Sequence, residues 1–162
     1  MATKVSKTRL QLPENVRTEA ISLLNARLAE TTDYAMQLKQ AHWNVKGRQF
    51  VALHEMFDSM VGQVLGHADL MAERAVQLGG QAYGTLQATA AASKLPAYPL
   101  EAQAAVDHLT ALAERLAILA ANVRTAIDTS DRLGDKDTAD LFTEVSRDLD
   151  KQMWYLEAHL AD

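Results

Sequence analysis

The chain contains no cysteine, and this absence excludes a whole set of functions. Disulfide scaffolds, thiolate metal sites and thiol catalysis all require cysteine, so any metal site must be built from nitrogen and oxygen ligands. Glycine and proline are also few, at 7 and 3 of 162 residues, whereas good helix formers such as alanine and leucine are abundant. This composition predicts an almost wholly α-helical protein with a single core.

Long apolar runs are missing as well. Residues 1–15 lack the apolar centre of a secretory signal, and no later segment supplies the roughly 20 uninterrupted apolar residues that cross a membrane. We therefore expect a cytoplasmic protein without a membrane partner.

Acidic residues are absent from the first ten positions, where the charged side chains are Lys4, Lys7 and Arg9. Because the whole chain has a formal net charge of −5, the remainder carries 13 basic against 21 acidic side chains, or −8. We expect a basic, flexible N-terminal tail over residues 1–14 and one domain over residues 15–162.

Four long segments repeat apolar residues at the three-to-four spacing of an amphipathic helix. A fifth, short helix is predicted over residues 85–92, between the second and third long segments. The predicted long helices run from Val16, with Asn15 as N-cap, to Asn44–Gly47; from about Gln49 to Leu78; from Pro99 to the polar stretch that contains Gly134; and from about Asp137 to Leu160.

The lengths of the connections predict the topology of this four-helix bundle. Those after the first and third long helices are short, whereas the middle connection of about twenty residues can span roughly 60 Å when extended. A helix of 30 residues is only about 45 Å long. The middle connection can therefore cross the bundle from end to end, as in ferritin-like folds with one long crossover.

Residues 40–73 concentrate side chains of the types that bind metals, namely His42, His54, Asp58, Asp69 and Glu73. His54 and Asp58 are four residues apart, and so are Asp69 and Glu73, so each pair shares one helix face. However, Asp58 and Asp69 lie about 16 Å apart along a helix that rises 1.5 Å per residue. One straight helix cannot bring both pairs to one ion.

The two pairs are nevertheless symmetric about one point near Gln63. A two-fold axis there sets His54 opposite Glu73, and Asp58 opposite Asp69, of an antiparallel second copy. The small residues beside this axis would let two helices approach closely; they are Ser59, Gly62 and Gly66. The spacing therefore predicts a dimer with two identical metal sites in its interface, to which His42 could add a further nitrogen.

Two imidazoles and three carboxylates suit iron, manganese or zinc, and the excess of carboxylate favours Fe(II). The alternative for each residue alone is an ordinary core or surface role. His67 and Asp69 lie on different faces of the same predicted helix, so His67 is left out of the set of candidate metal ligands. His108 and His159 have no partner nearby in sequence, and we assign them structural or exposed positions.

Three further residues carry two interpretations each. Trp43, beside His42, is either a packing residue or an oxidisable group that takes up stray oxidising equivalents near the metal. Asp137 and Asp140 either favour the positive end of a helix dipole or, where copies meet around an axis, ring a cation pore.

The segments KQAHWNVKG, FVALHEMFD, DLMAERAVQLGG and SRDLDKQMW closely resemble the Dps family of bacterial mini-ferritins. The resemblance covers about residues 15–160. It implies a hollow shell of twelve subunits, built from two-fold dimers, that oxidises Fe(II), preferably with hydrogen peroxide, and stores the ferric product inside. A structural nucleoid-compacting protein, or an iron store that does not bind DNA, is the alternative.

Carried over by position, the family's metal ligands fall on His42, His54 and Asp58 of one subunit and on Asp69 and Glu73 of its neighbour. The aspartates of the pore through which iron enters the family's shell fall on Asp137 and Asp140.

The basic tail resembles the lysine-rich tails with which some family members bind DNA, and its cations are Lys4, Lys7 and Arg9. Twelve tails on one shell would bind DNA multivalently without reading its sequence. Such binding implies an association with the nucleoid. A tail that only increases solubility is the alternative.

Overall fold

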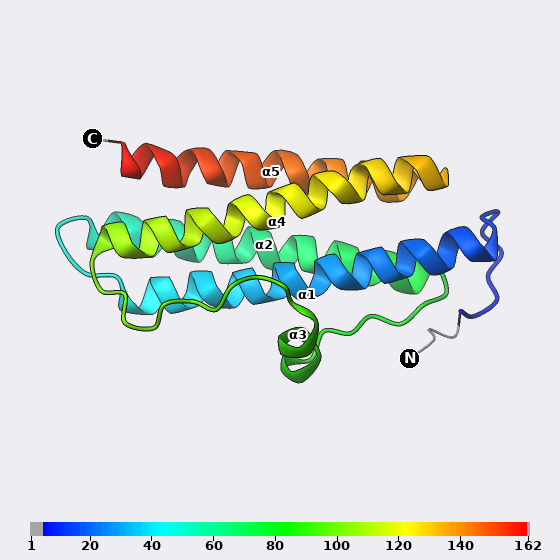
Figure 1. The fold of residues 1–162 in the computed structure, drawn as a ribbon, viewed down its shortest axis with the longest axis horizontal. Helices are drawn as coiled ribbons and strands as arrows, with labels where there is room; N and C mark the ends of the chain where they lie inside the picture. Colours follow the sequence, from blue (N-terminus) through cyan, green and yellow to red (C-terminus); the bar gives the residue numbers. More distant parts are fainter. Residues whose placement is uncertain (1–4, 162) are drawn as a thin grey trace.

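A computed structural model describes residues 5–161 as an all-α bundle of four long helices, with a short fifth helix beside it (Figure 1). No strand occurs among these residues. The expected fold class is therefore confirmed. The helices are α1 (Glu14–Asn44), α2 (Phe50–Gln77), α3 (Leu86–Ala92), α4 (Ala105–Leu133) and α5 (Lys136–Leu160).

The chain forms two antiparallel hairpins joined by one long crossover (Figure 1). Helix α1 pairs with α2, and α4 pairs with α5, while α1 also contacts α4 and α2 contacts α5. The crossover runs from the end of α2 back along the bundle, so α2 and α4 point the same way. Its short helix α3, capped by Thr85, packs against α1. The predicted crossover with a short helix is thus present.

Two predicted helix boundaries are wrong. Helix α1 begins at Glu14 after Pro13, whose carbonyl accepts the amide of Arg17 at 3.0 Å, so Asn15 lies inside the first turn and is not the N-cap. Helix α4 begins at Ala105 and not at Pro99, because residues 99–104 turn and then pair with the α1–α2 loop. In that pairing, Ala104 forms a backbone bridge with Lys46.

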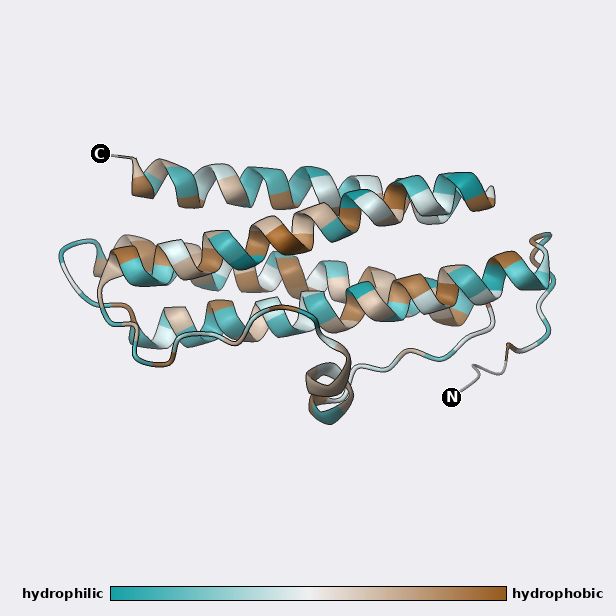
Figure 2. Cartoon of the chain, viewed as in Figure 1, coloured by the Kyte–Doolittle hydropathy of each residue, from teal (hydrophilic) through white to brown (hydrophobic). Residues whose placement is uncertain are grey.

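The core lies between the four long helices and is filled mainly by leucine, valine and alanine. Its largest fully buried side chains include Tyr34, Phe57 and Phe142, one from each of α1, α2 and α5. Figure 2 shows α5 as largely hydrophilic, with its hydrophobic residues on the side toward α4. Within residues 5–161, no helix combines the length and apolar character needed to cross a membrane.

Residues before α1 lie against the far end of α2. The amide of Ser6 donates to the carbonyl of Gly79 at 2.8 Å, and the Arg17 guanidinium donates to the carbonyls of Ser6, Leu12 and Leu78 at 3.1, 3.3 and 2.8 Å. Gly79 has a φ of +90°, and a Cβ there would lie 2.6 Å from the Ser6 oxygen. The contacts tie Ser6 to the bundle, and the flexibility of the predicted tail stays a prediction.

Candidate metal centre

His42 and His54 form a pair at one end of the α1–α2 hairpin. His42 lies near the end of α1 and is buried, and His54 lies in the first turns of α2 and is half-buried. Their rings stack with centroids 3.7 Å apart and planes inclined by 20°. His42 and His54 are twelve residues apart in sequence, but they lie on two antiparallel helices, so their imidazoles are side by side.

The hydrogen bonds of this pair are reciprocal. His42 Nδ1 lies 2.7 Å from the carbonyl oxygen of His54, and His54 Nδ1 lies 2.8 Å from the carbonyl oxygen of His42. A carbonyl only accepts, so each Nδ1 must carry the proton and donate. In the neutral ring each Nε2 then keeps a free lone pair, which is the arrangement of metal-binding histidines.

Asp58 lies one turn after His54 and is exposed. Its carboxylate forms an ion pair with the Lys39 ammonium from α1. The hydrogen bond from Lys39 holds the pKa of Asp58 below its ordinary value against the opposing effect of desolvation. The charge of Lys39, and more weakly interaction with His42 and His54, lowers the pKa further. The carboxylate is therefore ionised and already attracts a cation.

Asp69 and Glu73 are exposed on α2, in the half of that helix that leads away from the histidine pair. Within residues 5–161, no three or more histidine, aspartate and glutamate side chains meet so as to hold a metal. Thus the structure brings His42 and His54 together, with Asp58 one turn away, and it leaves Asp69 and Glu73 apart from them.

One outer face of α2 carries all three predicted carboxylate ligands. At 100° per residue they share a stripe with a fourth carboxylate, a glycine and three exposed apolar side chains. We call this the α2 stripe; it consists of Val51, Glu55, Asp58, Gly62, Leu65, Asp69, Glu73 and Val76. Its apolar members are 61%, 41% and 56% exposed for Val51, Leu65 and Val76, which is unusual for one face of a core helix.

The other predicted site residues lie at the surface. Trp43 follows His42 in the chain and is 66% exposed, so most of its surface has no packing partner within the single chain. Asp137 and Asp140 are exposed at the start of α5, and Asp137 comes within 3.9 Å of the Arg74 guanidinium. Lys7 and Arg9 are exposed as well. Lys4 lies outside the described residues.

Two polar clusters were not expected from the sequence. In the first, the Arg74 guanidinium donates to Asp135 at 2.7 Å and to Thr138 at 2.9 Å, and Asp135 is only 1% exposed. Asp135 also caps α5 by accepting the amide of Thr138 at 3.1 Å. Of this cluster, only the capping role of Asp135 was predictable from the sequence, because aspartate directly before a helix is a common cap.

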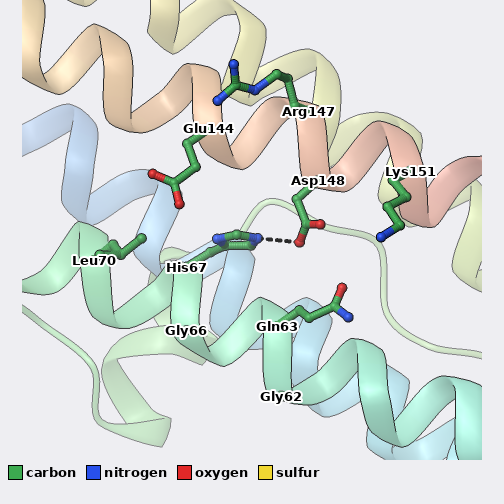
Figure 3. A pocket seen from close by; sticks show the side chains of 9 residues that line it. All are labelled: Gly62, Gln63, Gly66, His67, Leu70, Glu144, Arg147, Asp148 and Lys151. Atoms are coloured by element: carbon green, nitrogen blue, oxygen red, sulfur yellow. Dashed lines mark hydrogen bonds and ion pairs between the residues drawn. The ribbon is translucent and has the colours of Figure 1, made fainter.

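The second cluster lies in a hollow of about 710 Å³ between α2 and α5 (Figure 3). His67 Nε2 points at Asp148 across this hollow, at 2.7 Å, so His67 has a partner on α5 and not on its own helix. Besides His67, the α2 side of the hollow is lined by Gly62, Gln63, Gly66 and Leu70. The α5 side contributes charges of both signs. This pairing spans 81 residues, and nothing in the local sequence signals it.

The arrangement of two helical hairpins, with histidine and carboxylate side chains on α1 and α2, is that of ferritin-like proteins. The model of the ferritin-like domain family matches residues 21–162. The chain is also 50% identical over 159 residues to the DNA protection during starvation protein of Agrobacterium fabrum, with 98% of each chain covered. It is 32% identical over 149 residues to that of Mycolicibacterium smegmatis, covering 92% of this chain and 81% of the relative.

Solved structures agree with these sequence matches. DpsA14 from Streptomyces coelicolor superposes with a TM-score of 0.94 at 34% identity, covering 100% of this chain and 96% of that one. The tetragonal form of Mycobacterium smegmatis Dps gives 0.93 at 32% identity, with 97% and 96% covered. The chain belongs to the Dps family of ferritin-like proteins.

Proposed function

We propose that the protein oxidises Fe(II), preferably with hydrogen peroxide, stores the ferric product in a shell of twelve subunits, and so protects DNA from oxidative damage. The observation that supports this most directly is the state of the histidine pair. Both Nδ1 protons are held by backbone carbonyls, so both Nε2 atoms are free to bind a metal next to the ionised carboxylate of Asp58.

Each site is completed by a second copy of the chain. His42, His54 and Asp58 come from one subunit, and Asp69 and Glu73 come from the neighbour, whose α2 lies antiparallel. The α2 stripe supports this arrangement because its exposed apolar residues alternate with the carboxylates. An isologous contact would cover those apolar residues and bring the two pairs of ligands together at both ends of the interface.

Fe(II) is the substrate of this site, and the mixed nitrogen and oxygen ligands suit it. Two Fe(II) ions each give one electron to one molecule of peroxide. The peroxide O–O bond breaks, and two protons complete two waters. Because both electrons arrive at the same peroxide, no hydroxyl radical is released. The ferric ions then move to the interior of the shell.

Asp137 and Asp140 would ring the pore through which Fe(II) enters the shell. Both carboxylates are exposed at the start of α5, where those of other copies could approach them. The buried ion pair between Arg74 and Asp135 fixes this end of α5 against α2. We place the shell in the cytoplasm, in association with the nucleoid.

Sequence-independent DNA binding through the basic tail is the second proposed function. The relatives named for DNA protection favour it, and Lys7 and Arg9 are exposed and available to phosphates. Removal of residues 1–10 should abolish gel retardation of duplex DNA at low salt. Unchanged retardation would exclude the tail. It would not exclude binding by another surface.

Stopped-flow oxidation of Fe(II) by peroxide tests the principal proposal. His54→Ala and Asp58→Ala should each slow the oxidation strongly, whereas His159→Ala, which removes an exposed histidine near the end of α5, should leave it unchanged. If the first two variants oxidise iron as fast as the wild type, the oxidase proposal is wrong. The alternative of a nucleoid-compacting protein, in which the metal site only stabilises the interface, would then be favoured.

A further inference from the structure

Tyr98 and His108 form a hydrogen-bonded pair at the end of the bundle where α4 begins. Tyr98 lies on the crossover between α3 and α4, and His108 lies in the first turns of α4. The Tyr98 hydroxyl oxygen is 2.6 Å from His108 Nδ1, and the two rings are nearly parallel, with planes inclined by 18°. His108 is only 1% exposed and Tyr98 is half-buried, so this contact is partly shielded from water.

The direction of this hydrogen bond follows from the surroundings. The Tyr98 hydroxyl has no other hydrogen-bond partner within residues 5–161, so its proton is accepted only when the neutral His108 ring carries its own proton on Nε2, an atom without a partner among these residues. The backbone of Asn44 lies near enough to raise the pKa of His108. Nδ1 is therefore the acceptor, and the Tyr98 hydroxyl donates. Burial lowers the pKa of His108 overall and raises that of Tyr98, so the resting pair is a neutral imidazole and a neutral phenol.

The pair lies at the same end of the bundle as the histidines of the candidate metal centre. Asn44 follows His42 by two residues, a rise of about 3 Å along α1. The backbone bridge between Lys46 and Ala104 also joins the α1–α2 loop to the start of α4. Figure 1 shows the end of α1 and the start of α4 at this end.

A phenol loses an electron readily only when its proton can leave at the same time, because the phenol radical cation is a strong acid. Within residues 5–161, Tyr98 is the only tyrosine whose hydroxyl meets a ring nitrogen. Tyr34 is a natural contrast. It is fully buried close to Tyr98, and its hydroxyl has no hydrogen-bond partner among these residues.

We propose that Tyr98 and His108 form a proton-coupled redox site that removes hydroxyl radical formed when Fe(II) meets peroxide outside the two-electron reaction. The source of that radical rests on the proposed function. Hydroxyl radical takes one electron from Tyr98 and becomes hydroxide, while the phenolic proton moves to His108 Nδ1. The products are a neutral tyrosyl radical and an imidazolium. A second Fe(II) returns the electron and becomes Fe(III), and the proton goes back to the phenol.

The first experiment uses no iron, so it tests the pair independently of the proposed function. The chain has four tyrosines, and the Tyr83→Phe/Tyr155→Phe background leaves only Tyr34 and Tyr98. The full-length protein is oxidised with photogenerated tris-bipyridine ruthenium(III), frozen, and examined by electron paramagnetic resonance. Ring-deuterated tyrosine separates tyrosyl signals from those of tryptophan, because it narrows only the former.

A tyrosyl signal should form in this background. It should be lost with Tyr98→Phe, kept with Tyr34→Phe, and strongly reduced with His108→Gln, whose amide cannot accept the proton. Circular dichroism checks that each variant is folded. A signal that survives Tyr98→Phe, or one that is lost with Tyr34→Phe instead, overturns the proposal.

The second experiment mixes Fe(II) and peroxide with the same variants and follows iron oxidation in parallel. Oxidation together with a Tyr98-dependent radical supports the proposed source. Oxidation without that radical overturns the protective role. If no iron is oxidised, the proposed function fails, and the photochemical result still decides whether the pair is a redox site.

Discussion

Leu65 offers a direct test of the proposed dimer, which would complete the metal site. It is 41% exposed at the centre of the α2 stripe, close to the predicted two-fold axis. Since full burial of a leucine contributes about 2 kcal/mol, covering the exposed 41% should contribute about 0.8 kcal/mol per copy, or about 1.6 kcal/mol per symmetric interface. Leu65→Ala should therefore weaken dimer association by about tenfold.

Leu65→Glu should have a larger effect, because it places two carboxylates near each other in an interface that excludes water. We expect smaller particles by size-exclusion chromatography with light scattering, together with slow Fe(II) oxidation. Ile118→Glu is the matched control, since Ile118 is similarly exposed, at 38%, but lies on α4. If Leu65→Glu assembles and oxidises iron like the wild type, then the α2 stripe is not the interface and the reasoning from residue spacing is refuted.

Three further predictions concern single polar contacts. Arg74→Met leaves the buried carboxylate of Asp135 unpaired and should lower the free energy of unfolding in urea by about 3–5 kcal/mol. If the double variant with Asp135→Asn recovers this stability, the unpaired charge is confirmed as the cause. An unchanged urea midpoint in the single variant would contradict the prediction. Burial lowers the pKa of His108 in the folded state, so its stabilising effect is present above the ordinary histidine pKa and is lost as pH falls through the lowered value. The melting temperature of the wild type should therefore fall more steeply than that of His108→Gln between about pH 7 and 5, and parallel curves would disprove this. Lys39→Met removes the ammonium that pairs with Asp58 and, in the proposed site, would compete with Fe(II) for it. The variant should therefore lower the half-saturating Fe(II) concentration in oxidation assays, whereas a higher concentration would show that this lysine assists binding.

The long helices could be predicted because each buries one face and exposes the other. Their apolar residues therefore repeat with the helical period, as they do around Leu109 and Leu149. The start of α4 could not be predicted, because residues 99–104 are fixed by a turn and by the pairing of Ala104 with Lys46. Such pairing depends on a distant segment and leaves no periodic signal.

The ligand set was predicted from residue type and symmetry, and the structure brings its two histidines together. The reciprocal bonds of His42 and His54 could not be foreseen, because they depend on backbone carbonyls, which every residue has. The partner of His67 was missed for a related reason. Asp148 belongs to a different helix, and only the packing of α5 against α2 brings it near.

The reciprocal bonds between His42 and His54 also have an entropic consequence. Ordering a side chain costs on the order of 0.5–1.5 kcal/mol in lost rotamers. Because backbone carbonyls already orient both rings, this entropy is lost when the α1–α2 hairpin folds, and iron binding would not have to order the rings again. Asp69 and Glu73 are exposed in the single chain, so in the proposed dimer their ordering cost would fall on assembly. In the proposed dimer the imidazoles thus form a preset nitrogen part of the site, and loosening of the dimer would first remove the two carboxylates of the neighbour, Asp69 and Glu73.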